Sequence, residues 1–298
     1  MPLASASSGA RSLFLSTGFA PGLFVFLWST GFIFTKLGLG HAEPFTFLLV
    51  RFAVVFAIML PWALLARVVW PLRPAEIGHV AVVGLLMHGA YLGGVYTSIG
   101  RGFPAGLCAL IAGLQPLLTA TVVGPLLGER VSPRQWLGLV LGLVGVVMVL
   151  ADKATIGEGG FVAVALAVVA LIGITAGTLY QKRFCTTVDL RAGAVIQYGA
   201  AAIAMLAFAT PLETMRIDWA PQFVLAFTYL SLVLSIGGVS LLYALIRRGA
   251  AAKIASLFYL VPPVTALMAF FAFGETLGAV ALIGMGCAAG GVALVQRG

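Results

Sequence analysis

Polar and aromatic side chains recur at helical spacing inside the long apolar runs of this sequence. Residues three or four positions apart lie on one face of a helix, and a polar face within lipid must point to another helix or to water. Aromatic rings beside a few amides and hydroxyls suit a flat, amphipathic ligand. The candidate ligand-binding residues are Trp28, Phe32, His88, Tyr91, Gln115, Thr178, Gln181 and Tyr259.

Two basic side chains, His88 and Arg51, lie within apolar runs. His88 can titrate near neutral pH, so it could carry a proton or bind a carboxylate. A neutral histidine bonded within the helix bundle is the favoured alternative, because no acidic residue in these runs could complete a proton relay. Arg51 could also bind a carboxylate, but its place near the end of the second run favours a side chain that snorkels to the lipid headgroups.

Prolines interrupt the fourth and ninth apolar runs at Pro116 and at the pair Pro262 and Pro263. Proline removes a backbone donor from a helix. Irregular backbone is tolerated at membrane depth only against protein or a watery cavity. We therefore predict that both runs are hinged and line a path, and a harmless kink is the alternative.

Four charged residues near the ends of apolar runs form two possible pairs. Lys36 and Glu275 are expected near the outer face, and Lys182 and Glu129 near the inner face. Opposite charges at each mouth could pair when that mouth closes. Alternatively, each residue anchors a helix end among the headgroups, which is the commoner role of such charges.

The composition indicates what surrounds these residues. Hydrophobic residues make up 61% of the chain and charged residues 9%, whereas a soluble domain carries about 25% charged residues. Lipid must therefore be the solvent for most of the surface, and a span takes about 20 apolar residues. The sequence predicts an all-α membrane protein with ten spans, at 16–37, 44–66, 76–99, 104–126, 133–151, 160–182, 193–211, 221–245, 251–273 and 276–296.

The positive charges are expected to set the orientation of the protein in the membrane. The net charge of +8 comes mostly from residues between the runs, without a basic stripe interleaved with aromatics, so nucleic acid is excluded as a partner. Most of these residues fall on one set of loops, which places both termini in the cytoplasm. The expected setting is the inner (plasma) membrane of a bacterium.

Enzyme chemistry is not indicated. The cysteines Cys108, Cys185 and Cys287 are isolated, so neither a metal site nor a disulfide is expected, and no cofactor is predicted. A membrane metalloprotease would need HExxH, which is absent, and the three aspartates lie in loops. The short connections leave no room for a catalytic or nucleotide-binding domain.

The sequence repeats itself at an offset of about 146 residues, which divides it into halves 1–152 and 153–298. Gly31 falls on Gly177, Lys36 on Lys182, and Gly128-Glu129 on Gly274-Glu275. Because five spans is an odd number, the second half must cross the membrane upside down relative to the first. Inverted repeats of this kind are typical of transporters that bind a solute near the midplane.

Glycines spaced four residues apart predict close helix packing. The motifs are Gly89xxxGly93, Gly138xxxGly142, Gly173xxxGly177 and Gly286xxxGly290. They are expected to support packing within the bundle or contact in a dimer, and they identify no substrate.

The ten spans, the Gly-Glu pairs after the fourth span of each half, and the proline-bearing stretches 110–116 and 257–263 resemble the EamA type of the drug/metabolite transporter superfamily. The resemblance covers essentially the whole chain. It implies export of a small solute by alternating access, either facilitated or proton-coupled, from a monomer or homodimer. Within the superfamily the sequence is most similar to bacterial exporters of aromatic amino acids. Export of other drug-like solutes and a channel remain the alternatives.

Overall fold

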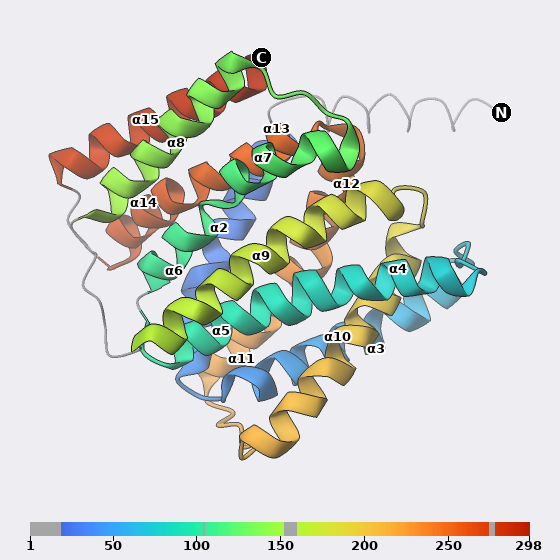
Figure 1. The fold of residues 1–298 in the computed structure, drawn as a ribbon. Helices are drawn as coiled ribbons and strands as arrows, with labels where there is room; N and C mark the ends of the chain where they lie inside the picture. Colours follow the sequence, from blue (N-terminus) through green and yellow to red (C-terminus); the bar gives the residue numbers. More distant parts are fainter. Residues whose placement is uncertain (1–18, 104, 152–159, 274–277) are drawn as a thin grey trace, which may run out of the picture.

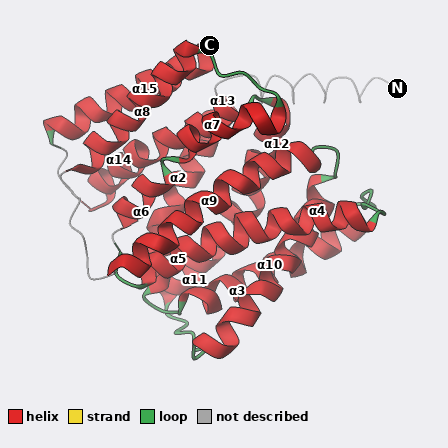
Figure 2. Ribbon diagram, in the orientation of Figure 1, coloured by secondary structure: helices red, strands yellow, loops and turns green. Residues whose placement is uncertain are grey.

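The computed structural model describes residues 19–103, 105–151, 160–273 and 278–298. These residues form helices joined by short loops (Figure 2). Their one extended contact is an isolated bridge between Ala42 and Ile217. The all-α prediction is thus confirmed for the described part of the chain. Helices satisfy their backbone donors and acceptors internally, as lipid requires.

The first half of the described chain runs through five predicted spans. The third span contains a π-helical segment, and the fourth is interrupted at Gly113 and Leu114. The elements are α2 (Phe19–Leu39), α3 (Pro44–Leu65), α4 (Pro74–Gly84), the π-helix η1 (Leu85–Leu92), α5 (Gly93–Gly100), α6 (Ala105–Ala112), α7 (Gln115–Leu127) and α8 (Pro133–Ala151).

The second half has the same order of irregularities. Its third span again holds a π-helical segment, and its fourth holds a 3-10 turn. The elements are α9 (Gly160–Phe184), α10 (Leu190–Leu212), α11 (Pro221–Thr228), the π-helix η2 (Tyr229–Gly238), α12 (Val239–Arg248), α13 (Ala251–Ser256), the 3-10 helix η3 (Leu257–Leu260), α14 (Val261–Phe273) and α15 (Ala279–Arg297).

Nine helices in the described ranges are long and apolar enough to cross a membrane. They coincide with nine of the predicted spans. The remaining predicted span, 133–151, is α8, whose apolar part Pro133–Val149 is shorter than the other nine. The described chain is therefore that of a multi-pass membrane protein.

Local sequence explains where several helices begin and end. Pro44, Pro74 and Pro221 stand at the first position of α3, α4 and α11, where a missing N–H costs no helical bond. The Asp189 carboxylate caps α10 by accepting from the Arg191 backbone N–H at 2.8 Å. The Arg191 side chain also bonds this carboxylate, and it lowers the pKa of Asp189 below its usual value.

Two helix pairs form opposite edges of the bundle (Figure 1). The helices α8 and α15 pack side by side at one edge, and α3 and α10 at the other. Between them α9 packs against η1 and α5, while α2 packs against α14 and η2.

Reciprocal carboxylate contacts hold the ends of α3 and α10 together. Glu43 accepts from the backbone N–H and the hydroxyl of Thr214, both at 2.7 Å. Glu213 accepts from the backbone N–H groups of Phe45 and Thr46 at 2.7 and 2.6 Å. The two loops at this end are thereby fixed to each other.

Close packing of α8 on α15 depends on glycine. A Cβ at Gly145 would lie 2.4 Å from the backbone nitrogen of Ala288, and one at Gly138 would lie 2.6 Å from the carbonyl oxygen of Gly291. The motif of Gly286 and Gly290 makes no such close contact within the described bundle. A Cβ at Gly286 would meet nothing within 4 Å, and one at Gly290 would only touch the Leu141 side chain at 3.9 Å, whereas Gly284 and Gly291 are the glycines of α15 that meet the backbone of α8.

Of the other two glycine motifs, one makes a close contact between helices and the other does not. A Cβ at Gly173 would lie 2.8 Å from the backbone nitrogen of Tyr91, and one at Gly177 would lie 2.6 Å from Met87, so this motif does let α9 approach η1. The motif of Gly89 and Gly93 makes no such contact, since nothing lies within 4 Å of a Cβ at Gly89.

Candidate functional site

A pocket of about 500 Å³, counting its open mouth, lies near the middle of α2 and of the third and eighth spans. Four of the eight predicted ligand-binding residues line it. Its lining is Trp28, Gly31, Phe32, Thr35, Arg51, Met87, His88, Tyr91, Leu92, Val95, Tyr96, Leu234 and Val239.

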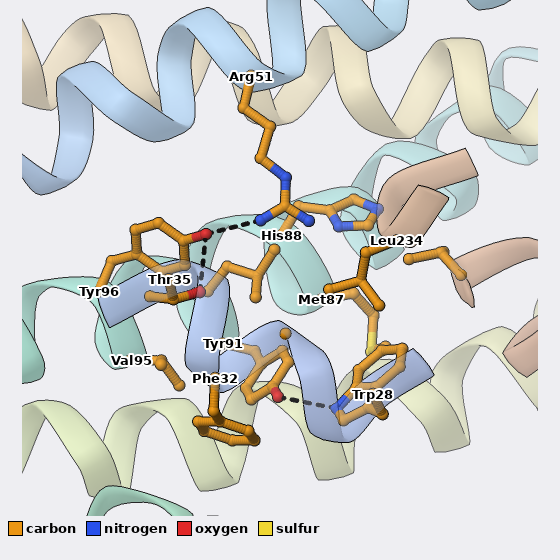
Figure 3. Close-up of a pocket in the computed structure, with 13 residues that line it drawn as sticks. Trp28, Phe32, Thr35, Arg51, Met87, His88, Tyr91, Val95, Tyr96 and Leu234 are labelled. Carbon is orange, nitrogen blue, oxygen red and sulfur yellow. Dashed lines mark hydrogen bonds between the residues drawn. The ribbon is translucent and has the colours of Figure 1, made fainter. Parts of the chain in front are cut away.

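Trp28 and Tyr91 form the aromatic end of the pocket (Figure 3). The Trp28 indole donates a hydrogen bond to the Tyr91 hydroxyl at 3.2 Å, and the two rings are nearly parallel, with centroids 6.4 Å apart. Phe258 packs edge-on against Trp28 at 5.5 Å. The hydrogen bond satisfies both polar atoms of a buried aromatic pair, which holds the rings in place.

A second hollow of about 260 Å³ lies on the other side of this aromatic pair. It shares Trp28, Phe32 and Tyr91 with the first pocket and adds Phe258 and Pro262. The aromatic pair therefore separates two adjoining spaces, one toward α3 and one toward the irregular segments of the fourth and ninth spans.

Arg51 forms the polar end of the first pocket. Its side chain is 2% exposed, so the prediction that it snorkels to the headgroups is wrong. The guanidinium donates from Nε to the Ser235 hydroxyl at 3.0 Å and from Nη1 to the Tyr96 hydroxyl at 2.8 Å. Thr35 donates to the same Tyr96 oxygen at 3.1 Å. Hydroxyls from the first, third and eighth spans thus hold the arginine inside the bundle.

His88 lies on the π-helical segment η1 beside the pocket. Its ring stacks on Tyr198 with centroids 4.3 Å apart, and its Nε2 atom is buried without a hydrogen-bond partner among the described residues. Extra residues in a π-helical turn change which side chains face inward, and such turns are frequent at functional sites. One face of the ring therefore packs against Tyr198 of α10, and its Nε2 atom remains available to another polar group inside the bundle.

The other four predicted ligand-binding residues lie outside this pocket. Gln115 donates to Thr178 at 3.4 Å, which links α7 to α9. Gln181 accepts from Gln197 at 3.3 Å and lines a separate hollow of about 190 Å³. Tyr259 is fully buried. Its ring packs directly on Gly142 of α8, because a Cβ at Gly142 would lie 2.5 Å from the nearest ring carbon.

One of the two predicted charge pairs is present. Lys182 and Glu129 are 2.5 Å apart. Lys182 also donates to the Gly249 carbonyl at 2.6 Å, and Glu129 accepts from the Ala251 backbone N–H at 2.9 Å. These contacts join the ends of α7, α9 and α12. Glu275 lies outside the described residues, and Lys36 is exposed.

The prolines stand where helices restart rather than inside continuous helices. Pro116 lies in the first turn of α7, after the break at Gly113. Pro262 and Pro263 lie in the first turn of α14, after the 3-10 turn η3. Pro262 and Gly113 both line the second hollow. Both irregular segments therefore border the candidate site.

Several pocket residues were not among the predicted ligands. Thr35 could have been found, since Trp28, Gly31, Phe32 and Thr35 follow the spacing of one helix face. Leu234 and Val239 carry no such signal, because Leu234 lies in the π-helical segment η2 and Val239 follows it directly, so the usual helical spacing does not apply.

No group of three His, Cys, Asp or Glu residues that could hold a metal ion occurs in the described ranges. The charged side chain that lines the pocket is Arg51.

Comparison with known proteins identifies the family. The model of the EamA-like transporter family matches residues 22–151 and again residues 161–297. The chain is 27% identical over 273 residues to the "Uncharacterized inner membrane transporter YedA" of Escherichia coli strain K12, covering 91% of this chain and 88% of that protein.

Two further matches agree with this assignment. The "Probable amino-acid metabolite efflux pump" of Salmonella typhimurium strain LT2 is 26% identical over 287 residues, covering 90% of each chain. A solved crystal structure has the same fold, with a TM-score of 0.77 over 94% of this chain and 96% of that one, at 21% identity. This chain belongs to the EamA-like transporter family.

Proposed function

We propose that the protein exports small amphipathic metabolites, among them amino acids with aromatic side chains, by alternating access. The observation that carries the proposal is the pocket near the middle of the spans, with an aromatic pair at one end and a polar cluster at the other. Such a pocket suits a solute that has both an apolar and a polar part. The name of the Salmonella relative, an amino-acid metabolite efflux pump, points the same way.

The proposal includes two halves of inverted topology, 1–152 and 153–298, which together form ten spans. Three observations support it. The family model matches twice, both halves carry a π-helical segment in their third span, and the pairs α3 with α10 and α8 with α15 each join equivalent spans. Two halves rocking about a central site would expose the pocket to each side in turn.

We place the protein in a bacterial inner membrane with both termini in the cytoplasm. The name of the Escherichia coli relative supports the membrane, and the positive loops support the orientation. In this orientation Lys182 and Glu129 lie at the cytoplasmic mouth, where their contact with the loop after α12 would hold that mouth closed.

Flux in proteoliposomes tests the function. Labelled phenylalanine, tryptophan, a non-aromatic amino acid and a cationic dye are loaded in separate preparations. We expect saturable, trans-stimulated movement of the amino acids and little movement of the dye. Flux without trans-stimulation would indicate a channel. Movement of the dye alone would indicate a drug exporter, and no flux above empty liposomes would contradict export of amino acids.

The native Cys185 provides a test of the cytoplasmic gate. It is 1% exposed and lines the hollow beside Gln181. Burial raises the pKa of this thiol to about 11, so in the closed state it is both shielded and protonated. We expect Glu129→Gln to weaken the closed state and to raise the rate of Cys185 labelling by an impermeant maleimide several-fold, in a background with Cys108 and Cys287 replaced by serine.

Glu76→Gln is the matched control, because Glu76 lies in the first turn of α4 at the same end of the bundle. This variant should label at the wild-type rate. Equal labelling of the Glu129→Gln and Glu76→Gln proteins from inverted vesicles would contradict the gate.

A further inference from the structure

We propose that Arg51 binds the carboxylate of the transported solute, so that the pocket takes small carboxylates with an apolar or aromatic group and rejects the corresponding amines. This inference rests on the proposed export function and specifies the substrate class of the same pocket.

The first step of the argument is the charge of Arg51. The side chain is 2% exposed, and an arginine keeps its proton even when buried. Within the described residues no carboxylate forms an ion pair with it, since its two hydrogen-bond partners, Ser235 and Tyr96, are neutral hydroxyls. A cation inside the bundle of a membrane protein without an anionic partner marks a functional site by default.

The second step concerns the donors that remain. Arginine presents five N–H groups in a planar fork that matches a carboxylate, and the two hydrogen bonds use one each from Nε and Nη1. The Tyr96 oxygen accepts from both Arg51 and Thr35. Its own proton has no acceptor among the described residues. The polar end of the pocket therefore offers donors to a ligand and is suited to an anion.

The third step is the shape of the space. Figure 3 shows the Arg51 guanidinium at one side of the pocket and the Trp28–Tyr91 pair at the other, with Met87 and Leu234 between them. A carboxylate on Arg51 would direct the rest of the ligand across apolar side chains toward the aromatic pair. None of the lining residues is acidic, so no carboxylate in the pocket pairs with an amino group.

The substrate class follows from these three steps. A carboxylate is the shared requirement, an aromatic or apolar group fills the opposite end, and an α-amino group is accepted but not demanded. A ligand with an amine in place of the carboxylate would set two positive charges against each other in a poorly hydrated site.

Ligand competition in wild-type proteoliposomes is the first test. Phenylalanine, 3-phenylpropanoate, phenylalaninamide and phenethylamine are compared as inhibitors of labelled phenylalanine counterflow. We expect the two carboxylates to inhibit at similar concentrations and the amide and the amine to need at least about tenfold more. Equal inhibition by the acid and the amide, with phenylalanine transported, would overturn this inference and leave the export function standing.

Variants separate ligand binding from a purely structural role. Arg51→Gln should raise the half-saturation concentration of phenylalanine at least about tenfold and abolish the preference for the acid, and Arg51→Lys should restore part of both. Ser235→Ala removes a structural contact of Arg51 but keeps the charge, so it should retain the preference. Arg216→Gln, an exposed arginine, is the charge-matched control. If Ser235→Ala and Arg51→Gln lose the preference equally, Arg51 acts only as a structural tie.

A binding measurement keeps the two proposals distinct. We expect 3-phenylpropanoate, but not phenethylamine, to raise the melting temperature of the purified wild-type protein in detergent. If this stabilisation occurs but no amino acid is transported, the result supports the carboxylate site and contradicts the export of amino acids. If neither compound stabilises the protein and phenylalanine is transported, the proposal that Arg51 binds a carboxylate is contradicted.

Discussion

A Gly145→Val protein is expected to lose the close pairing of α8 with α15 and to melt at an apparent Tm roughly 5–10 °C below the wild type. A Cβ at this position would lie 2.4 Å from the backbone nitrogen of Ala288 and 2.5 Å from the carbonyl oxygen of Gly284. A flexible side chain could rotate away, but these atoms are backbone, so the helices would have to separate. Overpacking costs about 1–3 kcal/mol, and we expect the upper end of that range here.

Gly286→Val is the matched control for this exchange. Gly286 lies on α15 in the same helix pair, but a Cβ there would meet nothing within 4 Å. Both variants add the same side chain to an apolar helix, so propensity and hydrophobicity are balanced between them. Thermal unfolding of the purified proteins in detergent measures the difference, and equal Tm values would show that the two helices do not pack as closely as described.

The spans could be predicted from the sequence because the signal is local. A run of apolar residues must form a helix to satisfy its backbone in lipid, and this requirement is independent of the rest of the fold. The predicted span 44–66 and the helix Pro44–Leu65 differ by one residue at the end. Pro71 and Pro74, which interrupt the apolar pattern, mark the start of the next helix in the same way.

The facing sides of the helices were harder to predict. Gly286 and Gly290 have the same spacing as Gly173 and Gly177, yet only the latter pair meets another helix closely. In a soluble protein the polar face would show which side points outward. Apolar residues cover every side of a membrane helix, so the sequence alone does not fix its rotation.

Arg51 shows the limit of local reasoning most clearly. Its position near the end of an apolar run favours snorkelling. Its hydrogen-bond partners Tyr96 and Ser235 are 45 and 184 residues away in the sequence. Ser235 also lies in the π-helical segment η2, where the usual helical spacing does not apply. Only the packing of three spans brings these hydroxyls to the guanidinium.

Trp28→Ala is expected to have the largest effect on transport among exchanges at the aromatic end. Trp28 is 7% exposed and contacts Phe24, Tyr91 and Phe258. Truncating a buried aromatic anchor of a binding site costs about 2–4 kcal/mol. We therefore expect the half-saturation concentration of phenylalanine to rise about 30-fold or more.

The exchange should also alter selectivity, because Trp28 stands between the two hollows. With alanine there, the spaces would join, and bulkier carboxylates should become relatively better inhibitors of counterflow than phenylalanine. Trp28→Phe keeps a ring but removes the donor to Tyr91, so it should weaken transport by less than Trp28→Ala and leave the size preference unchanged.

Trp62→Ala provides the comparison for loss of a tryptophan that lines no part of either hollow. Trp62 lies on α3 and is 48% exposed on the outer surface of the bundle, so this protein should transport phenylalanine as the wild type does. If Trp28→Ala and Trp62→Ala gave the same kinetics and the same size preference, the aromatic pair would not contact the solute. The binding site would then have to be sought elsewhere along the path, with the hollow beside Gln181 as the next candidate.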